Sequence, residues 1–510
     1  MDHLLTIITF LPLLGAVIVL LVPRAMASAT ALGVSLLTFA ASVPLWWKYD
    51  PQGVGPLAGW PTFQIVDGPY PWVDDLGIQY LVGLDGITLL LVLLTTFLTP
   101  IVIYASTSSV HKNVALYMAF MLVLETGMIG AFVALDTFLF YVFWELMLIP
   151  MYFLIGIWGG DNRIYATLKF FIYTLLGSLL MLVAILSLYV AFHDQTGVWS
   201  ASIIDLYTVE LSHSAQMWMF AAFALAFAVK VPMFPFHTWL PDAHVQAPTG
   251  GSVILAGVLL KMGTFGFIRY AMPLFPEATV AFAPLLIGLS VFGVIYGALV
   301  AMVQNDIKKL VAYSSVSHMG LVMLGLFAFN TIGVSGAVYQ MLNHGISTGA
   351  LFLLVGVLYE RRHTREISQY GGLAKVVPLF SAVFMVVTFS SIGLPGLNGF
   401  VGEILILLGS FEHNPVATVF ATTGVVLGAV YMLWVYQRIV FGPQTHIENR
   451  NLPDLTAREL AYLLPLLVLI VVMGVYPQPF LDRMEPTVAL LVAHLDAAGD
   501  AAAAVVGGGR

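Results

Sequence analysis

The sequence predicts an all-α polytopic membrane protein with about fourteen transmembrane helices. The chain of 510 residues is 60% hydrophobic and only 9% charged, whereas an average soluble domain contains about 25% charged residues. Apolar runs of about 20 residues, the length that crosses a bilayer, recur along almost the whole chain. Two runs are too long for one straight span and contain proline or glycine near the middle, which predicts broken helices.

The spans follow in order from the apolar runs. We predict them at 3–22, 27–47, 85–106, 113–133, 136–158, 164–192, 215–245, 249–272, 278–303, 307–328, 332–358, 376–411, 416–441 and 459–476. The interrupted spans are the seventh, 215–245, and the twelfth, 376–411. They are five spans apart, and an offset of five reverses the orientation in the membrane. We therefore predict two inverted five-helix repeats, spans 4–8 and 9–13, with broken helices 7 and 12.

This pattern divides the chain into four parts. Residues 1–110 hold spans 1–3 and a long Gly/Pro/Trp-rich outside loop at 48–84. Residues 111–275 hold the first repeat and residues 276–445 the second. Residues 446–510 hold the last span and a tail, AAGDAAAAVVGGGR, that we expect to be flexible.

The basic residues of the loops predict the orientation. With the N-terminus outside, the inside loops hold twelve cations: Arg24, Lys112, Arg163, Lys308, Lys309, Arg361, Arg362, Arg365, Lys375, Arg438, Arg450 and Arg458. The outside segments hold three: Lys48, Arg483 and Arg510. The excess inside supports an even number of spans with both termini outside. The first apolar run lacks a basic n-region and a cleavage site, so we expect a retained span.

Composition also excludes several functions. The chain has no cysteine, which excludes disulfides and Cys-ligated iron–sulfur clusters within it. Its net charge of −8 is small for this size and the charges lie mostly in loops, so nothing indicates nucleic acid. A Walker loop, a GxGxxG motif ahead of a helix and a Ser–His–Asp arrangement are all missing, so no nucleotide or flavin site is expected.

Three charges lie in the middle of apolar runs: Glu145, Lys230 and Lys261. Each costs about 2.5–3.5 kcal/mol at the bilayer centre unless it faces protein, water or an opposite charge. Such residues are typical of a pathway for ions or protons. Glu145 and Lys230 are a candidate pair, since unit charges about 4 Å apart at an effective dielectric constant of ~20 attract by about 4 kcal/mol. Closing and opening this pair would hold and release a proton; the alternative is a static ion pair.

The seventh span should break directly after Lys230, because KVPMFPFHTWLPDAH carries Pro232, Pro235 and Pro241. A charge beside a broken helix is the usual geometry of a transporter site. A kinked helix with a snorkelling lysine is the alternative.

The twelfth span contains SSIGLPGLNGFVGE, whose glycines and proline precede Glu403. If helical, Glu403 would lie about 12 Å beyond Pro395. The alternative is a packing kink in which Glu403 bonds to a serine.

His318 and His344 also lie within spans, and the unperturbed imidazole pKa of about 6.5 suits a proton relay. Either could instead be a satisfied core histidine. Glu125 and Lys169 are weaker candidates, since Lys169 is near a span end and could snorkel. His237, Asp242 and His244 fit no standard zinc spacing, so we predict no metal site.

Three stretches carry a resemblance to a known family. KVPMFPFHTWLPDAHVQAPTGGSVILAGVLLKMG, QNDIKKLVAYSSVSHMG and GLPGLNGFVGE resemble the signature of the proton-translocating, antiporter-like membrane subunits of respiratory complex I (NADH:quinone oxidoreductase). The resemblance covers nearly the whole chain. It implies fourteen helices, and it matches Glu145, Lys230, Lys261, His318 and His344 to the functional positions of helices five, seven, eight, ten and eleven.

At the helix-twelve position, most L-type and N-type relatives and Mrp antiporters carry lysine, whereas this chain has Glu403. That is similar to the M-type (chain-4) class. The short tail agrees, because about thirty residues are too few for the lateral helix of an L-type subunit.

The resemblance implies a mechanism. Quinone reduction elsewhere in the complex drives an electrostatic wave along the membrane arm, with Glu145–Lys230 as the gating pair. Lys261, the two histidines and Glu403 form the central axis. The chain would bind no cofactor; FMN, iron–sulfur clusters and quinone belong to partner subunits. The implied partners are L-type and N-type neighbours, the lateral helix of subunit L, phospholipids and protons. The Ala/Gly-rich composition favours a bacterial plasma membrane over a mitochondrial inner membrane.

Other functions remain open from the sequence. An Mrp-type cation/proton antiporter subunit or a membrane subunit of an energy-converting hydrogenase could use the same charges. A scaffold whose charges are purely structural is a further possibility.

Overall fold

The computed structural model describes residues 3–53, 55 and 63–507, and in that part helices dominate. The first half contains helices α1 (Leu4–Leu21), α2 (Ala27–Ser42), α3 (Leu45–Lys48), α4 (Gly86–Ser109), α5 (Val114–Val133), α6 (Thr137–Leu146), α7 (Leu148–Trp158), α8 (Arg163–Thr196), α9 (Ile203–Leu206), α10 (His213–Lys230), α11 (Trp239–Gln246), α12 (Thr249–Ile254), α13 (Leu260–Gly266) and α14 (Met272–Leu274). The second half contains α15 (Pro276–Met302), α16 (Ile307–Leu326), α17 (Thr331–Arg362), α18 (Pro378–Ser391), α19 (Asn398–His413), α20 (Pro415–Val440), α21 (Ala457–Val475) and α22 (Gln478–Gly507).

Twelve helices of the described chain are long and apolar enough to cross a membrane. The predicted seventh and twelfth spans are not among them, because each is divided into two shorter helices. The all-α membrane class is therefore confirmed, while the count of fourteen stays a prediction.

Both predicted breaks are present. Helix α10 ends at Lys230 and α11 begins at Trp239, with Pro232 and Pro235 between them. Helix α18 ends at Ser391 and α19 begins at Asn398. The prolines and glycines of these two stretches remove backbone donors or favour left-handed backbone, so the helix cannot continue through them.

The structure differs from the sequence-based expectation at two places outside the bundle. The loop at 48–84 contains an antiparallel hairpin, β1 (Ile65–Val73) and β2 (Ile78–Leu84), in which Ile65 pairs with Leu84. Glycine and prolines inside β1 hide its strand pattern, since such residues normally argue against a strand. The described part of the tail continues helix α22 to Gly507, a helix that was not predicted from the sequence, and the flexibility of the tail stays a prediction.

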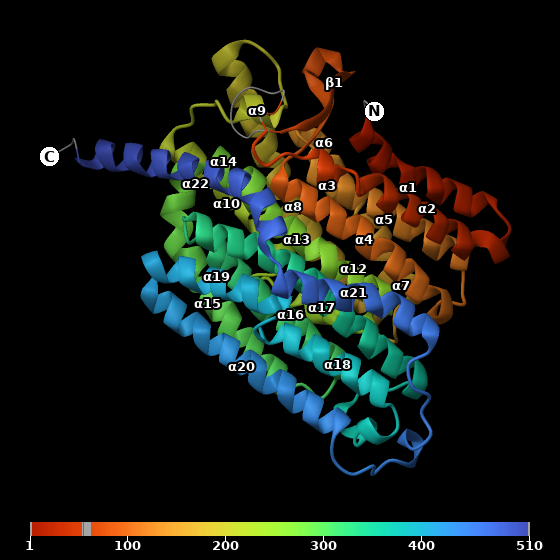
Figure 1. The fold of residues 1–510 in the computed structure, drawn as a ribbon. Coiled ribbons are helices and arrows are strands. Elements are labelled where there is room, and N and C mark those ends of the chain that lie inside the picture. Colours follow the sequence, from red (N-terminus) through yellow and green to blue (C-terminus); the bar gives the residue numbers. More distant parts are fainter. Residues whose placement is uncertain (1–2, 54, 56–62, 508–510) are drawn as a thin grey trace.

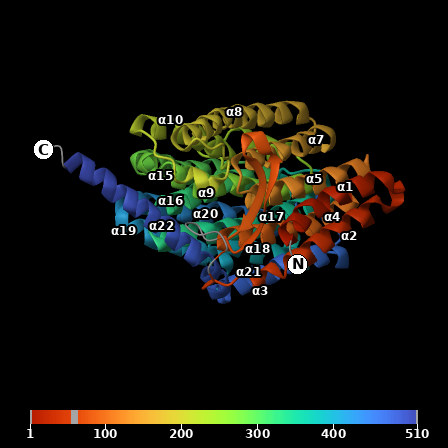
Figure 2. The same ribbon diagram turned by 90° about the horizontal axis from the view of Figure 1, so that it is seen from above.

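The arrangement of the helices places the most deeply buried ones in the centre. Figure 1 shows β1, α9 and both chain ends in the upper part of the molecule and the 442–456 loop at the bottom. From above, α8 and α21 lie at opposite edges, with α16 and α17 between them (Figure 2). The helical stretch from Thr249 to Leu274 and helix α17 are apolar and their spanning windows are 100% buried. Polar groups on these two elements are therefore isolated from lipid.

Candidate functional site

Lys261 lies at the centre of the bundle, on α13. Its side chain is completely buried and donates hydrogen bonds to the carbonyl of Ala256 and, at 2.6 Å, to Nδ1 of His344 on α17. Ala256 belongs to η3 (Leu255–Leu259), a π-helical segment that precedes α13. Such segments interrupt the regular hydrogen-bond ladder and are frequent at functional sites. The local irregularity thus gives a buried ammonium group a backbone acceptor.

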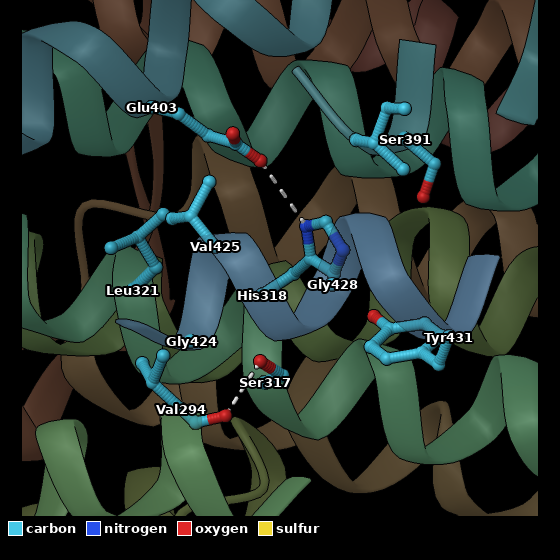
Figure 3. A pocket seen from close by; sticks show the side chains of 11 residues that line it. Val294, Ser317, His318, Leu321, Ser391, Glu403, Gly424, Val425, Gly428 and Tyr431 are labelled. Atoms are coloured by element: carbon cyan, nitrogen blue, oxygen red, sulfur yellow. Dashed lines mark hydrogen bonds and ion pairs between the residues drawn. The ribbon is translucent and has the colours of Figure 1, made fainter. Parts of the chain in front are cut away.

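Three further side chains continue from Lys261 across the second half of the chain. The rings of His344 and His318 have centroids 5.9 Å apart, and Nδ1 of His318 on α16 lies 3.8 Å from Oε1 of Glu403 on α19. Figure 3 shows the imidazole of His318 pointing at the Glu403 carboxylate. Residues far apart in the sequence therefore form one buried row: Lys261, His344, His318 and Glu403.

A small cavity lies at the Glu403 end of this row. Its volume is about 20 Å³, enough for one water molecule. His318, Glu403 and Tyr431 line it, and Gly424 and Gly428 of α20 leave it open on one side (Figure 3). A water here would bridge the 3.8 Å separation between imidazole and carboxylate.

The break between α18 and α19 folds back against Glu403 instead of leading away from it. A Cβ atom added to Gly393 would collide with the Glu403 carboxylate, and Gly393 has a φ of +69°. The 12 Å separation assumed a continuous helix from Pro395, and this condition is not met, because the chain between Ser391 and Asn398 is not helical. The alternative in which Glu403 bonds to a serine is not what the structure has, since the nearest charged partner of the carboxylate is His318.

A second group of buried polar side chains, from α17, α18 and α19, forms hydrogen bonds near this row. Ser347 and Ser390 share a hydrogen bond of 2.6 Å, and the Ser390 hydroxyl donates to Oδ1 of Asn398 at 2.5 Å. Asn343 donates to the carbonyl of Asn398 at 2.8 Å. These groups link α17 to both halves of the broken helix.

Glu145 and Lys230 belong to two helices of the first half of the chain, α6 and α10. Lys230 is buried (2% exposed) as the last residue of α10, and its Nζ lies 5.1 Å from the centre of the Trp144 ring. Glu145 is half-buried near the end of α6, and its Oε1 has no hydrogen-bond partner within the described part of the chain. The Glu145 charge acts on Lys230, but no ion pair within 4.0 Å joins them among the described residues. The expected pair is thus within electrostatic range but not closed.

Two residues at the site were missed from the sequence. His244 was considered only as a metal ligand, yet its buried ring stacks on Phe352 at 4.5 Å and feels the charges of Lys261 and Lys308. Lys308 was counted as an inside-loop cation, but it is 6% exposed and its Nζ donates to the carbonyl of Ala247 at 2.6 Å. Lys308 lines a cavity of about 180 Å³. One feature of the sequence could have identified His244 as a site residue: it follows the break after α10, within the same predicted span as Lys230.

The weaker candidates have simpler surroundings. Lys169 forms an ion pair of 2.7 Å with Asp242 and keeps 20% of its side chain exposed. Glu125 is completely buried on α5, facing Thr99. Asp242 is thereby engaged with a lysine, and no group of three His, Cys, Asp or Glu side chains converges as a metal site in the described residues.

Comparison with known proteins shows one family. The profile of the NADH:quinone oxidoreductase/Mrp antiporter transmembrane family matches residues 134–428. The chain is 46% identical over 517 residues to the NADH-quinone oxidoreductase subunit M of Rhodobacter capsulatus, covering 98% of each chain. It is 44% identical over 488 residues to the NADH-ubiquinone oxidoreductase chain 4 of Marchantia polymorpha, covering 95% of this chain and 96% of that protein.

A solved structure agrees with these relatives. A chain of respiratory complex I from Thermus thermophilus, a structure with bound NADH, superposes with a TM-score of 0.86 at 32% sequence identity. The superposition covers 96% of this chain and 99% of that one.

Proposed function

We propose a proton route through this chain from one premise: the chain belongs to the NADH:quinone oxidoreductase/Mrp antiporter family of transmembrane proteins. Within the family it is a membrane subunit of the proton-translocating NADH:quinone oxidoreductase, of the kind called subunit M or chain 4. Identity of 46% with such a subunit over 98% of the chain favours this assignment over an Mrp antiporter or a hydrogenase subunit. The chain contributes proton transfer, and FMN, iron–sulfur clusters and quinone bind to partner subunits.

Glu145 and Lys230 act as the gate. Closing the pair to about 4 Å would release about 4 kcal/mol at an effective dielectric constant of ~20. Moving one charge against 100 mV costs about 2.3 kcal/mol. The attraction between Glu145 and Lys230 is therefore larger than the cost of moving one proton across the membrane. A charge that arrives from the neighbouring subunit and strengthens or weakens this attraction could drive one proton transfer. The open arrangement in the structure, with Lys230 against the Trp144 ring, corresponds to one state of this gate.

Lys261, His344, His318 and Glu403 carry the proton. Lys261 passes it to Nδ1 of His344, which already accepts from Lys261 at 2.6 Å. Nε2 of His344 is buried without a hydrogen-bond partner in the described structure, so it is available for the next transfer. His318 then delivers the proton to Glu403 across 3.8 Å, through the water-sized cavity. The single observation that carries the proposal is this continuous row of titratable groups through an otherwise apolar core.

His244 and Lys308 supply the row from the inside. The cavity of about 180 Å³ reaches the buried Lys308, and His244 lies within the electrostatic range of Lys308, Lys261 and His344. The excess of cations in the inside loops supports placing this cavity on the cytoplasmic side.

The assembly and location follow the same proposal. Glu145 belongs to the first repeat and Glu403 to the second, which suits contact with an N-type neighbour on one side and an L-type neighbour on the other, the lateral helix of subunit L lying alongside. Both termini would lie in the periplasm of a bacterial plasma membrane. Chain-4 relatives such as the Marchantia protein leave the mitochondrial inner membrane as the alternative location.

The test is Glu145→Gln in the assembled complex, reconstituted into liposomes. Neutralising the gate should abolish NADH-driven acidification and lower NADH:quinone turnover about tenfold or more, since a lost interaction of 1.4 kcal/mol already changes a rate tenfold. Glu210→Gln is the matched control, because Glu210 is an exposed loop residue. Normal pumping by Glu145→Gln would instead support a scaffold.

A further inference from the structure

An apolar groove opens on the side of the bundle formed by α2, α3, α4, α17, α21 and α22. Its volume is about 370 Å³, and its lining side chains are aliphatic or aromatic. Trp46, Trp47 and Phe480 line one end, while Leu342 and Ile346 of α17 lie at its floor. The size is that of a binding site for a small molecule, and the only polar side-chain groups among the lining residues are the indole N–H groups of Trp46 and Trp47. The groove therefore suits a hydrocarbon chain.

We propose that this groove binds an acyl chain of an anionic phospholipid whose phosphate is held by Lys48 and Arg483. The distribution of charge carries the argument. The outside segments of the chain contain only three cations, Lys48, Arg483 and Arg510. Arg483 lies against the ring of Trp46, a lining residue, and Lys48 directly follows the lining residues Trp46 and Trp47, so two of the three adjoin this groove. Cations are scarce on that side of a membrane protein, so their position at an apolar opening indicates an anionic ligand.

Arg483 is available for such a ligand. Its guanidinium lies 3.5 Å from the centre of the Trp46 ring and donates to the carbonyls of Pro479 (2.8 Å) and Trp46 (3.3 Å). Its Nε is buried and has no hydrogen-bond partner within the described residues. No carboxylate lies within 4.0 Å of it there, and Oδ1 of the adjacent Asp482 accepts a hydrogen bond from Gln478 at 2.5 Å. A phosphate that approaches the guanidinium from the groove mouth would supply an opposite charge for Arg483.

Lys48 and Trp47 complete the mouth of the groove. Lys48 ends helix α3 and is exposed, and Trp47 next to it is 75% exposed. Asp50, the nearest acid in sequence, is engaged with the backbone of Gln52 at 3.0 Å. Tryptophan beside lysine or arginine is typical of the headgroup depth of a membrane. The rings of Trp46 and Phe480 are in edge-to-face contact, with centroids 5.3 Å apart, so an acyl chain would enter beside this pair, along Trp47, and run toward Leu342 and Ile346.

The floor of the groove lies against the turn of α17 that holds His344. Leu342 and Ile346 each stand two residues from His344, and a Cβ at Gly345 would lie 2.9 Å from Leu94, another lining residue. A bound acyl chain would therefore exclude water from the back of that turn. This consequence rests on the proposed function, and the scarcity of outside cations rests on the orientation proposed there. The binding experiment tests lipid binding without reference to proton transfer.

The experiment measures binding directly. The assembled complex is placed in nanodiscs that contain phosphatidylglycerol or phosphatidylcholine with a photoreactive diazirine on the acyl chain, and the labelled peptides are identified by mass spectrometry. We expect labelling of the α4 and α17 peptides of the groove, stronger with phosphatidylglycerol. The double variant Lys48→Gln/Arg483→Gln should lower the phosphatidylglycerol labelling roughly tenfold, to the phosphatidylcholine level.

Two matched variants separate charge from folding. Arg483→Lys keeps the charge and should retain the preference for phosphatidylglycerol, and Lys112→Gln removes an exposed inside cation and should change nothing. Leu93→Trp should fill the groove and abolish labelling by both lipids.

Equal labelling by both lipids in the unaltered chain would overturn the role of the two cations. Failure to label the groove peptides, or crosslinks there to a protein segment, would overturn lipid binding. None of these results depends on pumping.

Discussion

Lys261 and Lys169 are both lysines within predicted spans, but their surroundings differ. Lys169 has a carboxylate partner, Asp242, and is partly exposed. Lys261 is completely buried, and its partners in the described structure are a carbonyl and an imidazole. Burying a charge without an opposite charge lowers the free energy of unfolding. Lys261 therefore destabilises the fold, and we attribute its presence to its ability to carry a proton.

Replacement of each lysine by methionine should separate these roles. Lys261→Met removes a proton carrier, so NADH-driven acidification of liposomes should fall about tenfold or more. Lys169→Met removes a partly exposed pair worth at most ~1 kcal/mol and should pump at nearly the normal rate. Equal pumping by the two variants would contradict the proton row.

His244 offers a second test at the same scale. His244→Phe keeps the stack on Phe352 but removes the ring that can carry a proton, so proton pumping in liposomes should fall several-fold while the complex still assembles. His193→Phe is the control, since His193 stacks on Trp199 at 3.6 Å outside the row. If His244→Phe pumps as well as His193→Phe, His244 has only a packing role.

At the scale of elements, the two broken helices present their charges differently. The first break begins after Lys230, so the lysine is the last residue of α10. The second break precedes α19 and folds back over Glu403, which is on the second turn of that helix. Prolines and glycines thus determine where the helices stop, and the loop between α18 and α19 determines how closely Glu403 is enclosed.

The glycines of the second break allow a matched comparison. Gly393→Ala places a methyl group against the Glu403 carboxylate, whereas Gly396→Ala meets no atom within 4 Å. Both positions have positive φ, +69° and +91°, so both variants carry a backbone strain of about 1–2 kcal/mol. We expect a clear loss of proton pumping in Gly393→Ala beyond that in Gly396→Ala. The same activity in both would show that the position of Glu403 is unimportant.

At the scale of the whole molecule, one buried ion pair connects helix α4 to the helical stretch Thr249–Leu274 at the centre of the bundle. Arg269, at the end of the Lys261 helix, donates to Asp85, the N-cap of α4, and both side chains are almost fully buried (3% and 0% exposed). Removing one partner of a buried pair costs about 3–5 kcal/mol. Asp85→Asn should therefore lower the thermal stability of the complex, measured as the fraction that stays assembled after heating.

The exposed pair His213–Glu277 provides the control for this prediction. Its side chains are 70% and 39% exposed, so Glu277→Gln should change stability by at most ~1 kcal/mol. If Asp85→Asn is as heat-stable as Glu277→Gln, the Arg269–Asp85 pair does not hold α4 in place.

Much of this architecture could be predicted from the sequence, because a span must be apolar over about 20 residues and must satisfy its own backbone hydrogen bonds. Apolar length determined the spans, and the break after Lys230 was predicted to the residue, since proline acts locally. The hairpin β1–β2 was missed because its pairing lies outside the membrane, where hydropathy carries no information and internal prolines hide the strand. His244 and Lys308 were missed because their importance depends on neighbours distant in sequence.

By itself, the sequence determined that this is an all-α membrane protein with charges where lipid does not tolerate them. Those conclusions depend on composition and on local backbone chemistry, which each segment carries alone. Only the tertiary structure decided that Lys261 meets His344, that Glu403 faces His318, and that Glu145 and Lys230 stand apart. Each of these contacts joins different helices, and the packing of side chains between helices, not the periodicity within one helix, determines which charges come together.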